Sequence, residues 1–221
     1  MKIFLDTANI PDIRDRLEII DGITTNPSLV ARESNDLFGH VRKIADLAGN
    51  RIVMAEVLAR DSGNMAAEGR RLHALGPKMM IKVPATPAGL SAASVLSHEG
   101  IAVTVTLVFT ALQALLAARA GASAAALFVG RLDDAGQDGA SILHAAFTAI
   151  QLHKFSMSIV AASLRSVERA EACLAAGASM LTLPPPVADR LLDHPLTASG
   201  LAKFLSDWQQ IRPSEPAVSR A

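Results

Sequence analysis

The sequence has a single cysteine, no tyrosine and no excess of charge of either sign. The lone Cys173 excludes an internal disulfide framework and indicates a reducing compartment. Basic and acidic residues number 21 each, which argues against a nucleic-acid-binding face or a polybasic membrane patch. Without tyrosine, any acid–base or hydrogen-bonding role of a phenol must fall to another side chain.

Long apolar runs are also missing. None approaches the roughly 20 residues that a membrane-spanning helix needs. At the start, MKIFLDTANI, Asp6 interrupts the apolar run before it could form the core of a signal peptide. We therefore expect a soluble cytoplasmic protein with neither nucleic-acid nor membrane partners. Half of the 221 residues are hydrophobic, which is enough for a sizeable core.

Several motifs that carry chemistry are absent as well. The six histidines fall in expected helices or connections, without metal-ligand spacing or a His/Cys cluster, so no metal is expected. The chain contains no P-loop and no G-x-S-x-G. Cys173 stands among alanines on an expected helix, where core packing is its simplest role.

What the sequence does contain is an alternation of short apolar runs with longer stretches at helical spacing. Helix signals include Pro11 near one start, a Ser34 or Asn35 cap at another, and stops at Gly100 and Gly121. The expected strands cover residues 2–5, 22–25, 52–57, 79–83, 102–108, 125–129, 158–162 and 179–183, and the first helix is expected over residues 10–20.

Eight strands alternating with helices over about 190 residues predict an α/β protein, a single (β/α)8 or TIM barrel. A doubly wound open sheet is the alternative, although the first strand–helix turn, DTANIPD, has no G-x-G-x-x-G. We expect one domain over residues 1–211, including an extra C-terminal helix at GLAKFLSDWQQ, and a disordered tail over residues 212–221.

One lysine lies inside an apolar run. The segment MMIKVP predicts a buried strand with Lys82 near its end. Lysine is rarely buried without a partner. Lys82 therefore either extends to the surface, forms a buried ion pair with Glu56, or supplies a neutral amine for chemistry. A desolvated lysine is a nucleophile for carbonyl carbons and forms a Schiff base, which acts as an electron sink for C–C bond chemistry.

Polar residues stand near the carboxyl ends of most of the expected strands. In a barrel these ends meet at one mouth, where active sites are built. Plainer interpretations exist: Asp6 and Ser163 could cap helices. Arg131 could pair with Asp133 or Asp134. The polar set comprises Asp6, Thr24, Thr25, Asn26, Glu56, Lys82, Thr106, Arg131 and Ser163.

Together these residues suit Schiff-base chemistry on a compound that carries a phosphate. Asp6 and Glu56 supply two carboxylates, one to move protons on a substrate hydroxyl and one for the water that forms and hydrolyses the imine. Arg131 with Ser163 at a helix start would suit a phosphate, and Arg165 lies near enough in sequence to add charge.

At this point the motifs are recognisable, because the chain resembles the small bacterial transaldolases and the related fructose-6-phosphate aldolases. The resemblance covers Lys2 to about Trp208, and TTNPS with KVP in the fourth strand is a highly specific combination. It implies a cofactor-free reaction on sugar phosphates and rings of five chains that pair into decamers. The matching segments are FLDTANI, GITTNPSLV, AEVLA, IKVPAT, VTLVF, FVGRLDDAGQDG, AAS and HPLTASGLAKFLSDW.

The resemblance also implies a role for each catalytic residue. Lys82 matches the Schiff-base lysine, and Asp6 matches the acid–base group at the C4 hydroxyl of the substrate. Asn26 matches a residue that orients the lysine and the substrate hydroxyls. Glu56 and Thr106 match the pair that holds the catalytic water. The residues expected to bind substrate are Thr25, Thr104, Phe128, Arg131, Ser163 and Arg165.

Four positions bear on the reaction. Glu56 and Phe128 are of the transaldolase type, because the aldolase branch usually has glutamine and tyrosine there. Thr104 and Ala126 depart from the transaldolase pattern, which has asparagine and serine to hydrogen-bond the dihydroxyacetone unit. We expect transfer of that unit from fructose 6-phosphate or sedoheptulose 7-phosphate to an aldose phosphate. The alternatives are an aldolase that releases dihydroxyacetone or uses another donor, and a phosphosugar-binding barrel without turnover.

Overall fold

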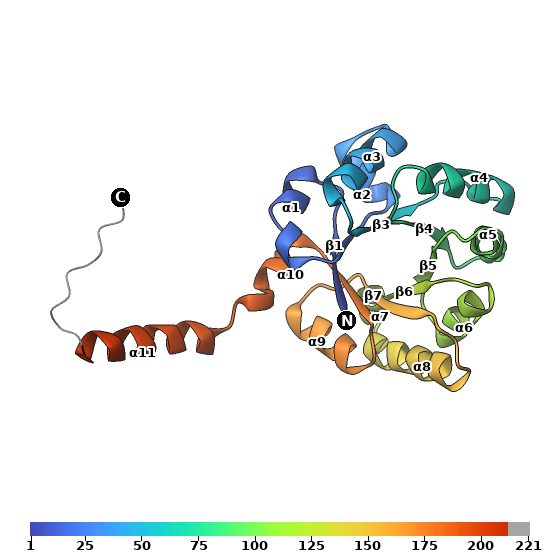
Figure 1. Cartoon of the computed structure of the whole chain (residues 1–221). Coiled ribbons are helices and arrows are strands. Elements are labelled where there is room, and N and C mark those ends of the chain that lie inside the picture. Colours follow the sequence, from blue (N-terminus) through green and yellow to red (C-terminus); the bar gives the residue numbers. More distant parts are fainter. Residues whose placement is uncertain (212–221) are drawn as a thin grey trace. The chain divides into compact units, whose positions relative to one another are not determined.

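The computed structural model describes residues 1–211, in which strands and helices alternate along the chain (Figure 1). Eight parallel strands close into a barrel in which consecutive strands pair and β1 pairs with β8. The predicted barrel is confirmed, and closure excludes the open sheet. The strands are β1 (Lys2–Asp6), β2 (Gly22–Thr24), β3 (Ile52–Glu56), β4 (Met79–Pro84), β5 (Val103–Val108), β6 (Ala124–Phe128), β7 (Ser158–Ala162) and β8 (Met180–Leu183).

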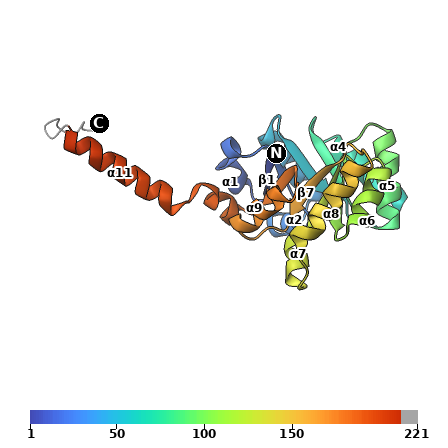
Figure 2. The same ribbon diagram turned by 90° about the horizontal axis from the view of Figure 1, so that it is seen from below.

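Helices surround the barrel, as both views of the ribbon show (Figures 1 and 2). They cover the outer faces of the strands, which explains why the strands are continuous apolar runs. Within the barrel unit the helices are α1 (Ile10–Arg14), α2 (Pro27–Glu33), α3 (Leu37–Ala48), α4 (Ser62–His73), α5 (Pro87–His98), α6 (Ala111–Arg119), α7 (Val129–Asp134), α8 (Gly139–Leu152), α9 (Val167–Ala175) and α10 (Pro185–Ala188).

Two predicted helix boundaries were wrong. The first helix ends at Arg14 and is followed by a 3-10 turn, Leu17–Ile19. The chain must turn back there, because the Asp21 carboxylate accepts a hydrogen bond from the Ile3 N–H at 2.7 Å before β2 begins.

The cap of α3 is Asp36, whose carboxylate accepts the Gly39 N–H at 3.0 Å. Neither Ser34 nor Asn35 serves as this cap. The unexpected helix α2 ends at Glu33, and the hydroxyl of its C-cap residue Ser34 accepts the Asp36 N–H at 3.0 Å instead. The start of α3 is therefore displaced along the chain by the helix that precedes it.

The barrel interior is packed with apolar side chains that form one cluster below the polar strand ends. A phenylalanine and three methionines come from β1, β3, β4 and β8, whereas β6 and β7 contribute alanines and a valine, so large and small side chains pack together. The buried members are Phe4, Met54, Met80, Ala124, Ala126, Val160, Ala162 and Met180. These side chains form the hydrophobic core of the barrel interior.

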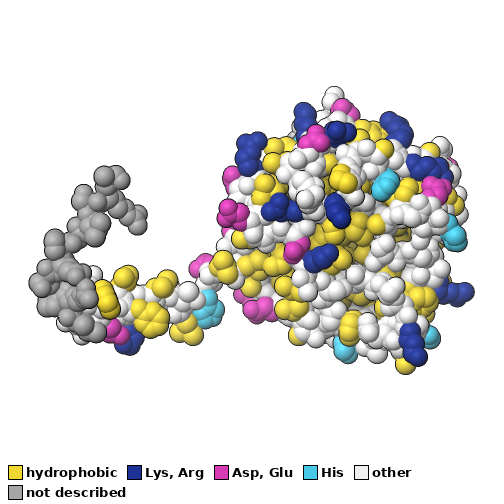
Figure 3. All heavy atoms as spheres, viewed as in Figure 1, with side chains coloured by type: hydrophobic (Ala, Val, Ile, Leu, Met, Phe, Trp, Pro, Cys, Tyr) yellow, Lys and Arg dark blue, Asp and Glu magenta, His cyan; other side chains and the backbone are white. Residues whose placement is uncertain are grey.

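The described chain forms two compact units, Met1–Ala188 and the part from Asp189 onward. The second contains a 3-10 turn, Asp189–Leu192, and α11 (Pro195–Ile211), which carries exposed apolar side chains (Figure 3). The expected single domain over residues 1–211 stays a prediction, and the expected tail lies outside the described residues. Within residues 1–211 no helix is long and apolar enough to cross a bilayer.

Candidate active site

A central cavity of about 100 Å³ opens among the carboxyl ends of the strands. An adjoining cavity of about 250 Å³ shares Asn26, Phe128 and Arg131 with it and adds Glu56 and Leu107. Six of the nine polar residues predicted to gather at one mouth line the central cavity and Glu56 lines the adjoining one, whereas Thr25 and Thr106 line neither. The central cavity is lined by Asp6, Thr24, Asn26, Met54, Lys82, Ala126, Phe128, Arg131, Val160, Ala162, Ser163 and Thr182.

Lys82 lies within this cavity and does not extend to the surface, since only 5% of the residue is exposed. Its Nζ donates a hydrogen bond to the Thr25 carbonyl at 2.9 Å. The same nitrogen lies 3.6 Å from Oε2 of Glu56. The pairing of β3 with β4 sets Glu56 beside Lys82. The strand register thus delivers an amine and a carboxyl to one buried point.

Glu56 is the carboxyl that this environment perturbs. Burial raises the pKa of Glu56, and the charges of Lys82 and Arg131 lower it in part, while Asp6 raises it further. A carboxyl with a raised pKa can both give and take a proton nearer to neutral pH than an exposed one. Its place beside the Lys82 amine fits proton transfer to a leaving or attacking water.

Asp6 faces the same cavity but caps no helix. The cap of α1 is Asn9, whose side chain accepts the Asp12 N–H at 3.0 Å. Oδ1 of Asp6 accepts a hydrogen bond from the Thr24 hydroxyl at 2.7 Å. Thr24 in turn lies 2.5 Å from the hydroxyl of Thr182. The alternative of a capping role for Asp6 is therefore wrong.

The turn after β2 supplies two more groups. Oδ1 of Asn26 caps α2 by accepting the Leu29 N–H at 3.0 Å, and Pro27 occupies the first turn of that helix. The amide nitrogen of Asn26 is thereby the atom available to donate to a ligand. The carbonyl of Thr25 holds Lys82, so this short turn fixes both residues.

Three threonines are fully or almost fully buried near Lys82. The hydroxyls of Thr25 and Thr106 have no hydrogen-bond partner among residues 1–211. Such a group costs about 1–3 kcal/mol unless an ordered water or a substrate atom satisfies it. The hydroxyl of Thr104 instead donates to Sδ of Met54 at 3.6 Å. Thr106 therefore has hydrogen-bonding capacity for a ligand, whereas that of Thr104 is partly used.

Arg131 and Ser163 meet at the rim of the central cavity. The guanidinium of Arg131 lies 4.8 Å from the centroid of the Phe128 ring and forms no ion pair within the described chain. The alternative of a pair with Asp133 or Asp134 is therefore wrong. A Cβ on Gly130 would lie 1.9 Å from the Ser163 carbonyl oxygen, so glycine permits this close approach.

Ser163 does not stand at a helix start, contrary to expectation. It follows β7 with φ of 62°, a left-handed conformation that is uncommon for serine. The cap of α9 is Ser166, whose hydroxyl accepts the Arg169 N–H at 3.2 Å. Ser163 therefore lies in the connection from β7 to α9 and lines the central cavity.

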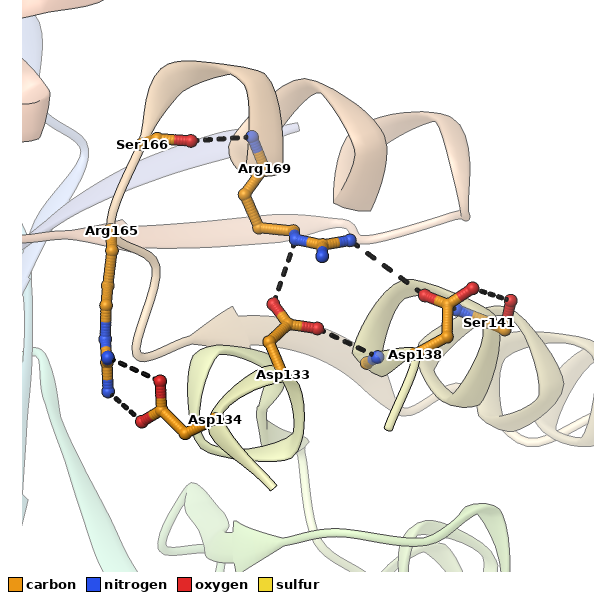
Figure 4. A network of polar contacts seen from close by, with 8 residues as sticks. Asp133, Asp134, Asp138, Ser141, Arg165, Ser166 and Arg169 are labelled. Atoms are coloured by element: carbon orange, nitrogen blue, oxygen red, sulfur yellow. Dashed lines mark hydrogen bonds and ion pairs between the residues drawn. The ribbon is translucent and has the colours of Figure 1, made fainter. Parts of the chain in front are cut away.

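Arg165 was expected to bind substrate, but the structure places it elsewhere (Figure 4). Its guanidinium forms a bidentate ion pair with Asp134, one arm of which measures 2.6 Å. It lines a separate cavity of about 170 Å³, together with Arg169, which pairs with Asp133 at 2.9 Å. These ion pairs tie α7 to the part of the chain that follows β7. Arg131 lies on α7, and Ser163 follows β7.

Two of the lining residues that the sequence analysis does not include are Thr182 and Leu107. Thr182 lies in the strand expected over residues 179–183, and its position near the strand end matches that of the other polar residues. Leu107 lies at an irregularity in the pairing of β5 with β6 and has φ of 57°. No sequence signal indicates this conformation, because leucine rarely adopts it.

Within residues 1–211 no group of His, Cys, Asp or Glu is arranged to hold a metal ion. Burial raises the pKa of the Cys173 thiol to about 11, so at neutral pH this side chain is an uncharged core group. The amine, carboxyls, hydroxyls and guanidinium at the barrel mouth are therefore the groups on which chemistry can be built.

Comparisons with known proteins place these groups in context. The transaldolase/fructose-6-phosphate aldolase family model matches residues 3–215. A probable transaldolase of Exiguobacterium sibiricum is 44% identical over 212 residues, which cover 95% of this chain and 99% of that protein. One from Halalkalibacterium halodurans is 45% identical over 210 residues, covering 94% and 99%.

Solved structures show a similar fold at low sequence identity. Thiamine phosphate pyrophosphorylase from Pyrococcus furiosus has a TM-score of 0.62 at 13% identity, covering 86% of this chain and 93% of that one. A native KDPGal structure has a TM-score of 0.60 at 15% identity, covering 94% and 93%. At these identities the likeness shows the fold alone.

The environment of Glu56 leads to a testable prediction. The substitution Lys82→Met keeps the buried volume and removes the charge that most favours the ionised carboxylate. We expect the pKa of Glu56 to rise further, measured by NMR titration of the glutamate side-chain carboxyl carbons. The variant Glu56→Gln identifies the resonance. A pKa that stays constant or falls would contradict the proximity of the two groups in solution.

Proposed function

Because the chain belongs to the transaldolase/fructose-6-phosphate aldolase family, we propose that it is a transaldolase that acts through a Schiff base on Lys82. It takes a dihydroxyacetone unit from fructose 6-phosphate or sedoheptulose 7-phosphate and transfers it to an aldose phosphate. The observation that carries this proposal is the buried amine of Lys82, which lines the central cavity 3.6 Å from the Glu56 carboxylate.

The first step joins Lys82 to the substrate. The neutral amine attacks the C2 carbonyl, and the carbinolamine loses water to form the iminium. Glu56, whose raised pKa fits both giving and taking a proton, transfers the protons of this step. The unpartnered Thr106 hydroxyl holds the water with Glu56. The iminium supplies the electron sink, so the mechanism requires no cofactor.

The second step breaks and remakes a carbon–carbon bond. Asp6 removes the proton of the C4 hydroxyl, the C3–C4 bond breaks, and its electron pair moves into the iminium to give an enamine. The aldose phosphate leaves, and an acceptor aldehyde is attacked by C3 of the enamine. Asp6 returns the proton to the new hydroxyl, and Asn26 orients the hydroxyls with its amide nitrogen. Water then hydrolyses the new imine.

The phosphate of each substrate binds at the rim. Arg131 offers an unpaired guanidinium, and Ser163 a hydroxyl, at one end of the central cavity. Arg165 does not contact the phosphate and adds only positive charge, because its guanidinium is held by Asp134. The strength of phosphate binding therefore depends mainly on Arg131.

Transfer is favoured over release of free dihydroxyacetone. The ring of Phe128 packs 5.9 Å from that of Phe109 and carries no hydroxyl that could protonate the enamine. A class I aldolase with another donor is the second candidate. It is favoured by Thr104, whose hydroxyl is bonded to Met54, and by Ala126, which has no polar group for the hydroxymethyl end of the dihydroxyacetone unit.

The protein acts as a cytoplasmic homo-oligomer of five or ten chains. Four large apolar residues of α11 recur at i, i+3, i+4 and i+7 and so form one stripe. Each is between 58% and 69% exposed in the single chain. A stripe of this kind is suited to bury itself against another copy. These residues are Leu201, Phe204, Leu205 and Trp208.

The central prediction concerns covalent trapping. Borohydride added with fructose 6-phosphate should leave a reduced three-carbon adduct on Lys82, located by mass spectrometry of the protein and its peptides. The folded variant Lys82→Arg should give no adduct and no activity, because arginine forms no imine. A folded wild-type protein without adduct would overturn the mechanism. Substantial free dihydroxyacetone without an acceptor aldehyde would instead support the aldolase.

A second prediction compares the two arginines. Arg131→Ala should raise KM for fructose 6-phosphate about 10- to 100-fold, the effect of losing a charged hydrogen bond. Arg165→Ala should raise it less than about threefold, since it removes an exposed ion pair. Unphosphorylated fructose, which lacks the group that Arg131 binds, is the control and should respond to neither. Equal effects of the two variants on KM would refute the assignment.

A third prediction concerns assembly. Replacing Leu205 and Trp208 by serine should convert the oligomer to smaller species, measured by light scattering after size exclusion. The matched control is Gln210→Ser, since Gln210 lies on the opposite side of α11. A wild-type monomer, or an oligomer that both sets of substitutions leave intact, would show that this stripe does not join the chains.

A further inference from the structure

Three side chains that line the central cavity are connected by hydrogen bonds. Thr182 on β8, Thr24 on β2 and Asp6 on β1 are brought together because β1 pairs with both β2 and β8 in the closed barrel. The two threonines are 4% and 3% exposed and line the cavity. Thr182 belongs to none of the catalytic roles assigned above.

The direction of the hydrogen bonds follows from counting hydrogens. A threonine hydroxyl has one hydrogen, and that of Thr24 is donated to Oδ1 of Asp6 at 2.7 Å. The contact of 2.5 Å between Thr24 and Thr182 must then use the hydrogen of Thr182. The chain therefore runs from Thr182 to Thr24 to the carboxylate.

We propose that Thr182 is a positioning residue for the reaction, which fixes the hydroxyl of Thr24 on Asp6. This inference rests on the proposed function of Asp6 as the base at the C4 hydroxyl. A free hydroxyl rotates among several staggered positions, and one of these points to Oδ1. Because Thr182 occupies a lone pair of Thr24, it selects that position.

The consequence is an oriented carboxylate. Oδ1 of Asp6 is anchored by Thr24, and within the described chain the carboxylate accepts no second hydrogen bond, so Oδ2 is left to take the substrate proton. The other charged groups of this region are Lys82 and Arg131, which line the central cavity, and Glu56, which lines the adjoining one. Thr182 changes none of these charges, so its effect is on the direction of a single hydrogen bond.

The test is a pair of substitutions that separate the hydroxyl from the methyl group. Thr182→Val keeps the shape of the side chain and removes the hydroxyl, whereas Thr182→Ser keeps the hydroxyl. We expect Thr182→Val to lower kcat about tenfold, with KM changed less than about twofold. Thr182→Ser should restore kcat to within about threefold.

A double-mutant cycle establishes whether Thr182 acts through Thr24. If it does, Thr24→Val with Thr182→Val should be no slower than Thr24→Val alone. Multiplied effects, or a kcat unchanged by Thr182→Val, would overturn the inference. Equal circular dichroism of all variants checks the fold. If Thr182→Val alone is unstable, the comparison of Thr24→Val with the double variant remains informative.

Trapping with borohydride separates this inference from the proposed function. The imine on Lys82 forms before Asp6 acts, and Thr182→Val slows the later cleavage without abolishing it, so the variant should still give a reduced adduct on Lys82 with fructose 6-phosphate. If the wild-type protein forms no adduct, the proposed function is wrong and the role of Thr182 is wrong with it. If it forms the adduct and Thr182→Val turns over normally, only the role of Thr182 is wrong.

Discussion

The burial of the Lys82 amine beside the Glu56 carboxyl is the constraint on which the rest of the site depends. An amine this deep is stable only if neighbouring groups satisfy it, and the fold supplies a backbone carbonyl at 2.9 Å and a carboxyl oxygen at 3.6 Å. Both come from strands or turns whose place is fixed by barrel closure. A small change in strand register would separate the pair, so the apolar packing of the interior also preserves the chemistry.

The turn after β2 shows how few residues perform several tasks. Thr25 offers its carbonyl to Lys82, and Asn26 uses one half of its amide as a helix cap and leaves the other half for a ligand. Pro27 restricts the backbone where the helix begins. Because local and tertiary requirements coincide here, this motif was recognisable in sequence, and the structure places it where the residues suggested.

The barrel and the gathering of polar strand ends could be predicted because both follow from local patterns. Strand boundaries differ from expectation by no more than one residue. The choice among possible partners could not be predicted. Asp36 rather than Ser34 caps α3, and Arg165, which precedes α9, pairs with Asp134 of α7. The cap of α3 depends on where the unexpected helix α2 ends, and the pairing of Arg165 depends on the distance between segments far apart in the chain. Hydrophobic periodicity carries no information about either. The strand-end position of Thr182 is visible in the sequence, but its contact with Thr24 on another strand is not.

The outer ion pairs explain why one arginine faces the cavity unpaired. The network in Figure 4 contains three aspartates, Asp133, Asp134 and Asp138, but only two arginines, Arg165 and Arg169. Both arginines are therefore committed, and the excess of carboxylate makes this outer cavity unfavourable for a second anion. Arg131 lies on the same helix as two of these aspartates yet points to the aromatic ring of Phe128. Under the proposed function, this charge distribution would direct the phosphate of the substrate to Arg131 at the central cavity and its carbonyl carbon to Lys82.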